Sequence, residues 1–69
     1  MIISDFTDYH IDLFREKCNF VGNEVFVFEM RIQGIPIEEI AYELGKSVSG
    51  INYISSKVNR KIKDVLEFY

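Results

Sequence analysis

The sequence predicts an all-α fold, a four-helix domain that contains a helix-turn-helix at about residues 36–58. Apolar residues recur at helical spacing along most of the chain, and no two strand-like segments are available to pair. Within the stretch IEEIAYELGKSVSGINYISS, Ala41 lies four residues before Gly45, and Ile51 lies six residues after it. A small side chain lets two helices approach closely, and a glycine accepts the positive φ of a tight turn. The β-branched Ile51 then fills the angle between the two helices.

Length and composition limit the classes that the chain can belong to. At 69 residues it forms one small domain, residues 1–69, and its apolar content of 48% excludes a disordered chain. Cys18 is the single cysteine, so no intramolecular disulfide or cysteine zinc site is expected, and we expect a small buried apolar side chain. No apolar run approaches a membrane span, and residues 1–3 are too short for a signal peptide. We therefore expect a cytoplasmic, reduced protein with no membrane association.

The first helix is expected over residues 4–17, with Ser4 and Asp5 at its start. Its apolar face consists of Phe6, Tyr9, Leu13 and Phe14. The second helix is expected over about residues 23–33, after the break at 19–22 and before Gly34. Residues 25–28 also suit a strand by propensity, but charged neighbours and the lack of a partner strand favour a helix.

The third helix is expected from Pro36 to Leu44, because a proline in the first turn loses no hydrogen bond. Gly45 and Lys46 form the turn, and either Ser47 or Ser49 caps a fourth helix over about 48–67. The apolar stripe of this last helix is longer than a helix-turn-helix needs, and consists of Ile51, Ile54, Val58, Ile62, Val65 and Tyr69. The part from Ile62 onward must cover either the aromatic face of the first helix or a second copy of the chain.

The net charge of −3 is unevenly distributed. Residues 1–45 carry three cations against nine acids, a balance of −6, whereas residues 46–69 carry five cations against two acids, a balance of +3. Basic side chains on the fourth helix are suited to contact phosphate. Cations near the C-terminus of an ordinary solvated helix also favour the helix dipole, so both interpretations stay open.

Residues 24–62 resemble region four of bacterial sigma factors, the part that reads the −35 promoter element, and related helix-turn-helix proteins of phages and mobile elements. The similarity rests on VFEMRIQG at 27–34, IEEIAYELG at 37–45, Ser47 at the turn and KVNRKI at 57–62. The resemblance implies sequence-specific DNA binding in transcription regulation, with double-stranded DNA as partner. The chain has no counterpart of the other sigma regions, so it resembles an isolated module.

The expected interface lies on the fourth helix, which this motif commonly places in the major groove. The expected base contacts are Val48, Ser49, Gly50, Asn52 and Tyr53, and the expected phosphate contacts are Lys46, Ser56, Lys57, Arg60 and Lys61. Sigma factors carry arginine, glutamate and glutamine at these base-contact positions. This chain has no arginine among them, so the arginine contact to guanine is not available here. Asparagine suits adenine and valine suits the thymine methyl group. Tyr53 is either a DNA contact or a rim residue over the core.

The sequence leaves three alternatives to a monomeric DNA-binding protein open. The chain can be a helical hairpin that only packs, or a module that binds RNA polymerase or a sigma-like partner without reading DNA. One copy offers few base contacts, so a homodimer through the first helix and the C-terminal part of the fourth is expected. His10 stands alone and no serine has a nearby histidine, so we expect no enzyme, metal or cofactor.

Overall fold

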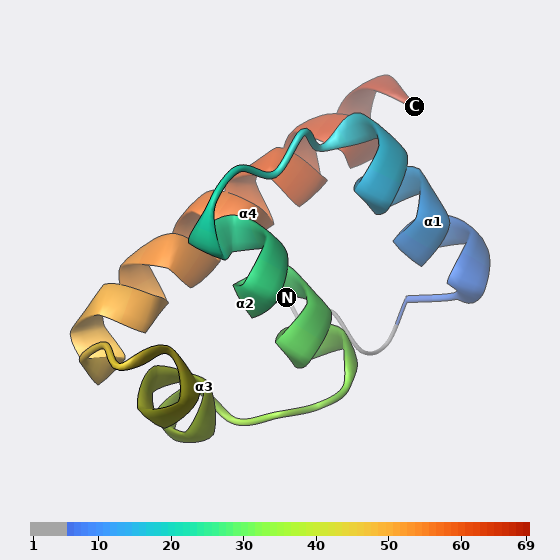
Figure 1. The fold of residues 1–69 in the computed structure, drawn as a ribbon. Helices are drawn as coiled ribbons and strands as arrows, with labels where there is room; N and C mark the ends of the chain where they lie inside the picture. The colour runs from blue at the N-terminus through green and yellow to red at the C-terminus, as the bar shows by residue number, and fades with distance from the viewer. Residues whose placement is uncertain (1–5) are drawn as a thin grey trace.

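The computed structural model describes residues 6–69, and the helices within them confirm the all-α prediction. The four helices are α1 (Asp8–Lys17), α2 (Asn23–Ile32), α3 (Ile37–Leu44) and α4 (Val48–Phe68). No strand occurs within residues 6–69, so the strand alternative for residues 25–28 is wrong. The long helix α4 contacts each of the other three: α3 lies beside its N-terminal end, α1 beside its C-terminal end, and α2 between them (Figure 1).

Capping side chains mark the starts of α1 and α4. α1 begins at Asp8, later than predicted, because the Thr7 hydroxyl accepts a hydrogen bond from the backbone N–H of His10 at 3.4 Å. Ser4 and Asp5 lie outside the described residues. At the start of α4, the Ser47 hydroxyl accepts from the backbone N–H of Gly50 at 3.0 Å, so Ser47 and not Ser49 is the cap.

The turn between α3 and α4 has the geometry that its glycine predicts. Gly45 has φ of 64° in the left-handed region, which a side chain resists. Its backbone N–H donates to the Tyr42 carbonyl at 3.3 Å, and the N–H of Lys46 donates to the Ala41 carbonyl at 2.9 Å. This pair of bonds closes the C-terminus of α3 and directs the chain into α4.

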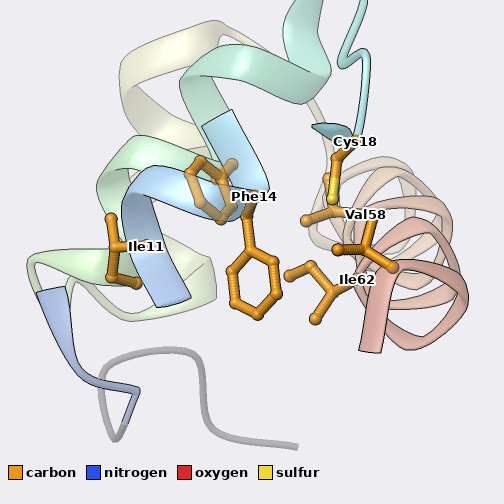
Figure 2. Close-up of a cluster of buried hydrophobic side chains, with 7 residues drawn as sticks. Ile11, Phe14, Cys18, Val58 and Ile62 are labelled. Carbon is orange, nitrogen blue, oxygen red and sulfur yellow. The ribbon is translucent and has the colours of Figure 1, made fainter. Parts of the chain in front are cut away.

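One buried cluster joins α1, α2 and the C-terminal half of α4. Phe14 of α1 is fully buried beside Val58 and Ile62 of α4, as Figure 2 shows. Burying a side chain of this size contributes about 1.5–3 kcal/mol. The cluster consists of Ile11, Phe14, Cys18, Phe28, Val58, Ile62 and Val65. Of the two partners considered for the C-terminal apolar stripe of α4, the structure places α1 of the same chain against it.

A second buried cluster holds α3 against α4 and α2. Ile40 and Ile51 are fully buried, and Ala41 is 4% exposed between them. Val27 of α2 completes the cluster. The small side chain of Ala41 therefore occupies the close approach that its spacing predicts. Within residues 6–69, no helix has the length and apolar character needed to cross a bilayer.

Candidate nucleic-acid interface

One face of α4 near the α3–α4 turn carries four of the side chains expected to contact bases, together with Ser56, an expected phosphate contact. We call Val48, Ser49, Asn52, Tyr53 and Ser56 the α4 strip. All five are exposed, with Val48 at 42% and Tyr53 at 64%. They lie together because residues three or four apart on a helix share a face, and Ile51, Ser55 and Val58 point into the core from another face. The strip therefore presents a continuous polar and apolar surface to solvent.

Gly50 differs from the other expected base contacts because it is half-buried. A Cβ built at this position would lie 3.2 Å from the Ser47 hydroxyl oxygen. That hydroxyl is the one that caps α4. Gly50 thus lies against the cap and outside the α4 strip, and it can offer only backbone atoms to a partner.

The packing of α3 fixes the orientation of the α4 strip. Ile51 lies on the opposite face of α4 from Ser49 and Tyr53, and it is fully buried against α3. Ser47 caps the first turn of α4, so that turn is ordered from its first residue. The strip therefore has a fixed position relative to the body of the protein.

Cationic side chains flank the strip on its C-terminal side. The Lys57 ammonium lies 4.7 Å from the centroid of the Tyr53 ring, an arrangement in which the ring attracts the cation. Arg60 is exposed one turn further, and a shallow hollow of about 230 Å³ lies between Tyr53, Ser56, Lys57 and Arg60. Lys46 is exposed in the turn before α4. The Ser56 hydroxyl donates to the Asn52 carbonyl at 2.9 Å, so its hydrogen atom is already used within α4.

Lys61, which the sequence suggests as a phosphate contact, is paired within the chain, although it lines a hollow together with Lys57 and Arg60. Its ammonium donates to the Glu24 carboxylate of α2 and to the Asn19 carbonyl, the latter at 3.2 Å. Glu24 is only 9% exposed, and its carboxylate also accepts from the Val21 N–H at 3.3 Å. The hydrogen bond from Lys61 lowers the pKa of Glu24 against the opposing effect of burial. Lys61 is therefore held by an acid of the same chain.

The sequence reasoning missed Glu24 as a structural residue. The helical spacing of the sequence does indicate that Glu24 is buried. Glu24 precedes Val27 and Phe28 by three and four residues, and so shares their buried face. A carboxylate on a buried face needs a cationic or hydrogen-bonding partner. The sequence does not identify Lys61 as that partner, since it lies 37 residues away.

Acidic side chains limit how far the basic surface extends. Glu38 and Glu39 are exposed in the first turn of α3, and Asp64 and Glu67 are exposed on the last turns of α4. Arg15 of α1 donates to both carboxylate oxygens of Glu29, at 3.0 and 2.9 Å, and the bond lowers the pKa of Glu29. Lys46, Lys57 and Arg60 are the exposed cations nearest to the α4 strip along the chain, and Lys63 is exposed about one turn after Arg60.

A buried cluster between α1 and the C-terminal part of α4 uses part of the face expected to form a homodimer. Phe14 and Ile62 are fully buried against each other's helices, and Val65 is 5% exposed. The apolar stripe of α4 ends there, because Tyr69 is 71% exposed with the Lys17 ammonium 5.3 Å from its ring centroid. The expected dimer through α1 and the C-terminal part of α4 therefore cannot use this buried cluster, although Tyr9, Leu66, Phe68 and Tyr69 of the same segments are exposed.

The surroundings of Cys18 and His10 indicate structural roles for both side chains. Burial raises the pKa of the Cys18 thiol to about 11, so the thiol is protonated at neutral pH and is a poor nucleophile or metal ligand. The His10 ring packs on Phe6 and Phe14, and its Nδ1 lies 2.8 Å from the Thr7 hydroxyl. In the described part of the chain, no three histidine, cysteine or acidic side chains form a group that could hold a metal ion.

Comparisons with known proteins give little for this chain. No protein-family model matches it, and no solved structure matches it. It is 37% identical over 54 residues, 78% of its length, to "Endo-1,4-beta-xylanase B" of Thermotoga neapolitana. The chain spans only 15% of the length of that protein, so the similarity does not place it in a family.

Proposed function

We propose that the protein binds double-stranded DNA, with the first turns of α4 in the major groove, as a sequence-specific regulator of transcription. The observation that carries this proposal is the α4 strip: polar and apolar side chains that are exposed on a helix whose other face is locked against α3. A helix held in this way is narrow enough to enter the major groove. Helix-turn-helix proteins present the first turns of their second helix to base edges, and the resemblance of residues 24–62 to sigma region four agrees with that use.

The flanking cations support the proposal through phosphate contact. Lys57 and Arg60 lie about one and two turns after Tyr53 of the strip, and Lys46 precedes the strip. Phosphates border the groove on both sides, so cations before and after a reading surface fix the position of the helix without reading sequence. Three neutralised phosphates give a slope of about −2.7 in a plot of log affinity against log salt. That slope corresponds to an affinity loss of about fortyfold between about 50 mM and about 200 mM salt.

The test is binding of the purified protein to a pool of short random duplexes at these two salt concentrations, followed by sequencing of the bound fraction. We expect binding that weakens at the higher salt and a recurring sequence in the bound DNA. Absence of binding even at about 50 mM salt, where phosphate contacts are strong, would reject the proposal. Binding with no enriched sequence would retain DNA contact and reject sequence-specific regulation.

A protein-interaction module is the second candidate, and the charges on α3 favour it. Glu38 and Glu39 are exposed at the start of the helix that precedes the strip. Acids at that position oppose approach to phosphate. The partner would be RNA polymerase or a sigma-like protein, which a pull-down with purified polymerase tests directly. Polymerase binding that survives charge reversal at Lys57 and Arg60, with no DNA binding, would favour this candidate.

A further inference from the structure

The reading surface of α4 carries no cation. Between Lys46 and Lys57, residues 47–56 contain no lysine, arginine or acidic residue. The commonest specific contact to a G·C pair is a lysine or arginine that donates to guanine O6 and N7, and an acidic side chain accepts from cytosine. Neither chemistry is available within the strip. Lys57, the nearest cation on the helix, lies over the Tyr53 ring.

The side chains that the strip does present match A·T pairs. Asn52 is exposed, and its amide combines an acceptor with a donor, the pattern that pairs with adenine N6 and N7. Val48 is 42% exposed one turn before Asn52, and an apolar side chain contacts the thymine methyl group. Residues four apart on a helix are neighbours on its surface, so Val48 and Asn52 face adjacent base pairs. Ser49 suits any base and adds no preference.

Resting on the proposed function, we infer that the α4 strip selects A·T pairs, with Asn52 on an adenine and Val48 on a thymine methyl. The target site is then a duplex in which at least two neighbouring major-groove positions are A·T. Flanking phosphate contacts from Lys57 and Arg60 supply affinity without altering that preference.

The first test is the composition of the duplexes enriched from the random pool. Enrichment of A·T pairs at the central positions supports the inference. Enrichment of G·C pairs overturns it while leaving DNA binding intact. No binding to any duplex overturns the proposed function and this inference together, so the two failures are distinguishable.

The second test assigns the contacts by changing single atoms of the enriched DNA. Replacing the contacted adenine by 7-deazaadenine removes the N7 acceptor, and we expect about fivefold to 150-fold weaker binding. Replacing the contacted thymine by uracil removes one methyl group, and we expect about fourfold weaker binding.

Variants then connect each atom to its side chain. Asn52→Ala should bind adenine and 7-deazaadenine duplexes equally, and Val48→Ser should bind thymine and uracil duplexes equally. Both residues are exposed, so both variants keep the core unchanged. A wild-type protein that tolerates both base changes, or an Asn52→Ala variant that remains sensitive to 7-deazaadenine, would overturn the assignment.

Discussion

Lys61 of α4 and Glu24 of α2 form an ion pair on the side of α4 that faces α2, and the Lys61 ammonium also bonds the Asn19 carbonyl at 3.2 Å. The pair connects the segment after α1, the start of α2 and the middle of α4. It also pairs one of the cations expected to contact phosphate. The charge at Lys61 is thus used for the fold, while those at Lys57 and Arg60 remain exposed.

Loss of this pair should destabilise the protein. We expect Lys61→Met to lower the free energy of unfolding by about 1–3 kcal/mol, because a nearly buried carboxylate loses its charged partner. Lys57→Met makes the same chemical change one turn earlier at an exposed position, and we expect it to cost less than about 0.5 kcal/mol. Urea unfolding of both variants measures the difference. Equal losses in the two variants would show that the pair has no structural role.

The ion pair should also make stability depend on pH. Hydrogen bonding from Lys61 holds the pKa of Glu24 below its ordinary value of 4.5, although burial opposes the shift. A lowered pKa in the folded state stabilises the protein above the unfolded value, and this contribution disappears as the pH falls through the folded value. The stability advantage of the wild type over Glu24→Gln should therefore be constant near neutral pH and shrink below about pH 4.5.

Unfolding by urea between about pH 7 and about pH 3 measures this advantage, with Glu16→Gln as the control. Glu16 is exposed and its ion pair with Lys17 is long, at 3.7 Å, so that variant should follow the wild-type pH profile. A Glu24→Gln profile parallel to that of the wild type throughout would contradict the role assigned to the pair.

Ala41 should be intolerant of a larger side chain. It is 4% exposed where α3 meets α4, so Ala41→Leu forces the helices apart and should cost about 1–3 kcal/mol of unfolding free energy. The neighbouring Tyr42 is 84% exposed, and we expect Tyr42→Leu to change stability by less than about 0.5 kcal/mol. Thermal unfolding compares the two. An Ala41→Leu variant as stable as Tyr42→Leu would mean that the close approach is not required.

The packing of α1 on α4 should be independent of protein concentration. Ile62 is fully buried in the cluster that contains Phe14, so Ile62→Val should lower the free energy of unfolding by about 0.5–1.5 kcal/mol. Because the cluster lies within one chain, the unfolding midpoint should not change with concentration in either protein. A midpoint that rises with concentration, and a smaller rise in Ile62→Val, would instead place this face in a dimer.

The region from α3 to α4 could be predicted from the sequence because each of its signals is local. Pro36, Gly45 and Ser47 mark helix ends by their own backbone preferences, and the spacing of Ala41 and Ile51 sets the packing between the helices. The start of α1 was predicted too early, because Thr7 competes as a cap with residues before it and local sequence does not rank them.

The exposure of the α4 strip could also be predicted from the sequence, because its residues lie on a different side of the helix from the apolar residues Ile51 and Val58. The role of Lys61 could not be predicted from the sequence. It stands one residue before Ile62 on the border of the apolar stripe, and its partner lies on another helix. The choice between α1 and a second chain as cover for α4 also depends on tertiary packing, which helical periodicity alone does not decide.

The most direct test of DNA binding through α4 is the slope of log affinity against log salt for the wild type, Lys57→Glu and Lys17→Glu. Both substitutions reverse one charge and lower the net charge by two, but Lys17 lies near Tyr69, at the other end of α4 from the strip. We expect the slope of Lys57→Glu to be smaller in magnitude by about 1, and that of Lys17→Glu to equal the wild type. Equal slopes for all three proteins, or equal changes in the two variants, would contradict phosphate contact beside the strip.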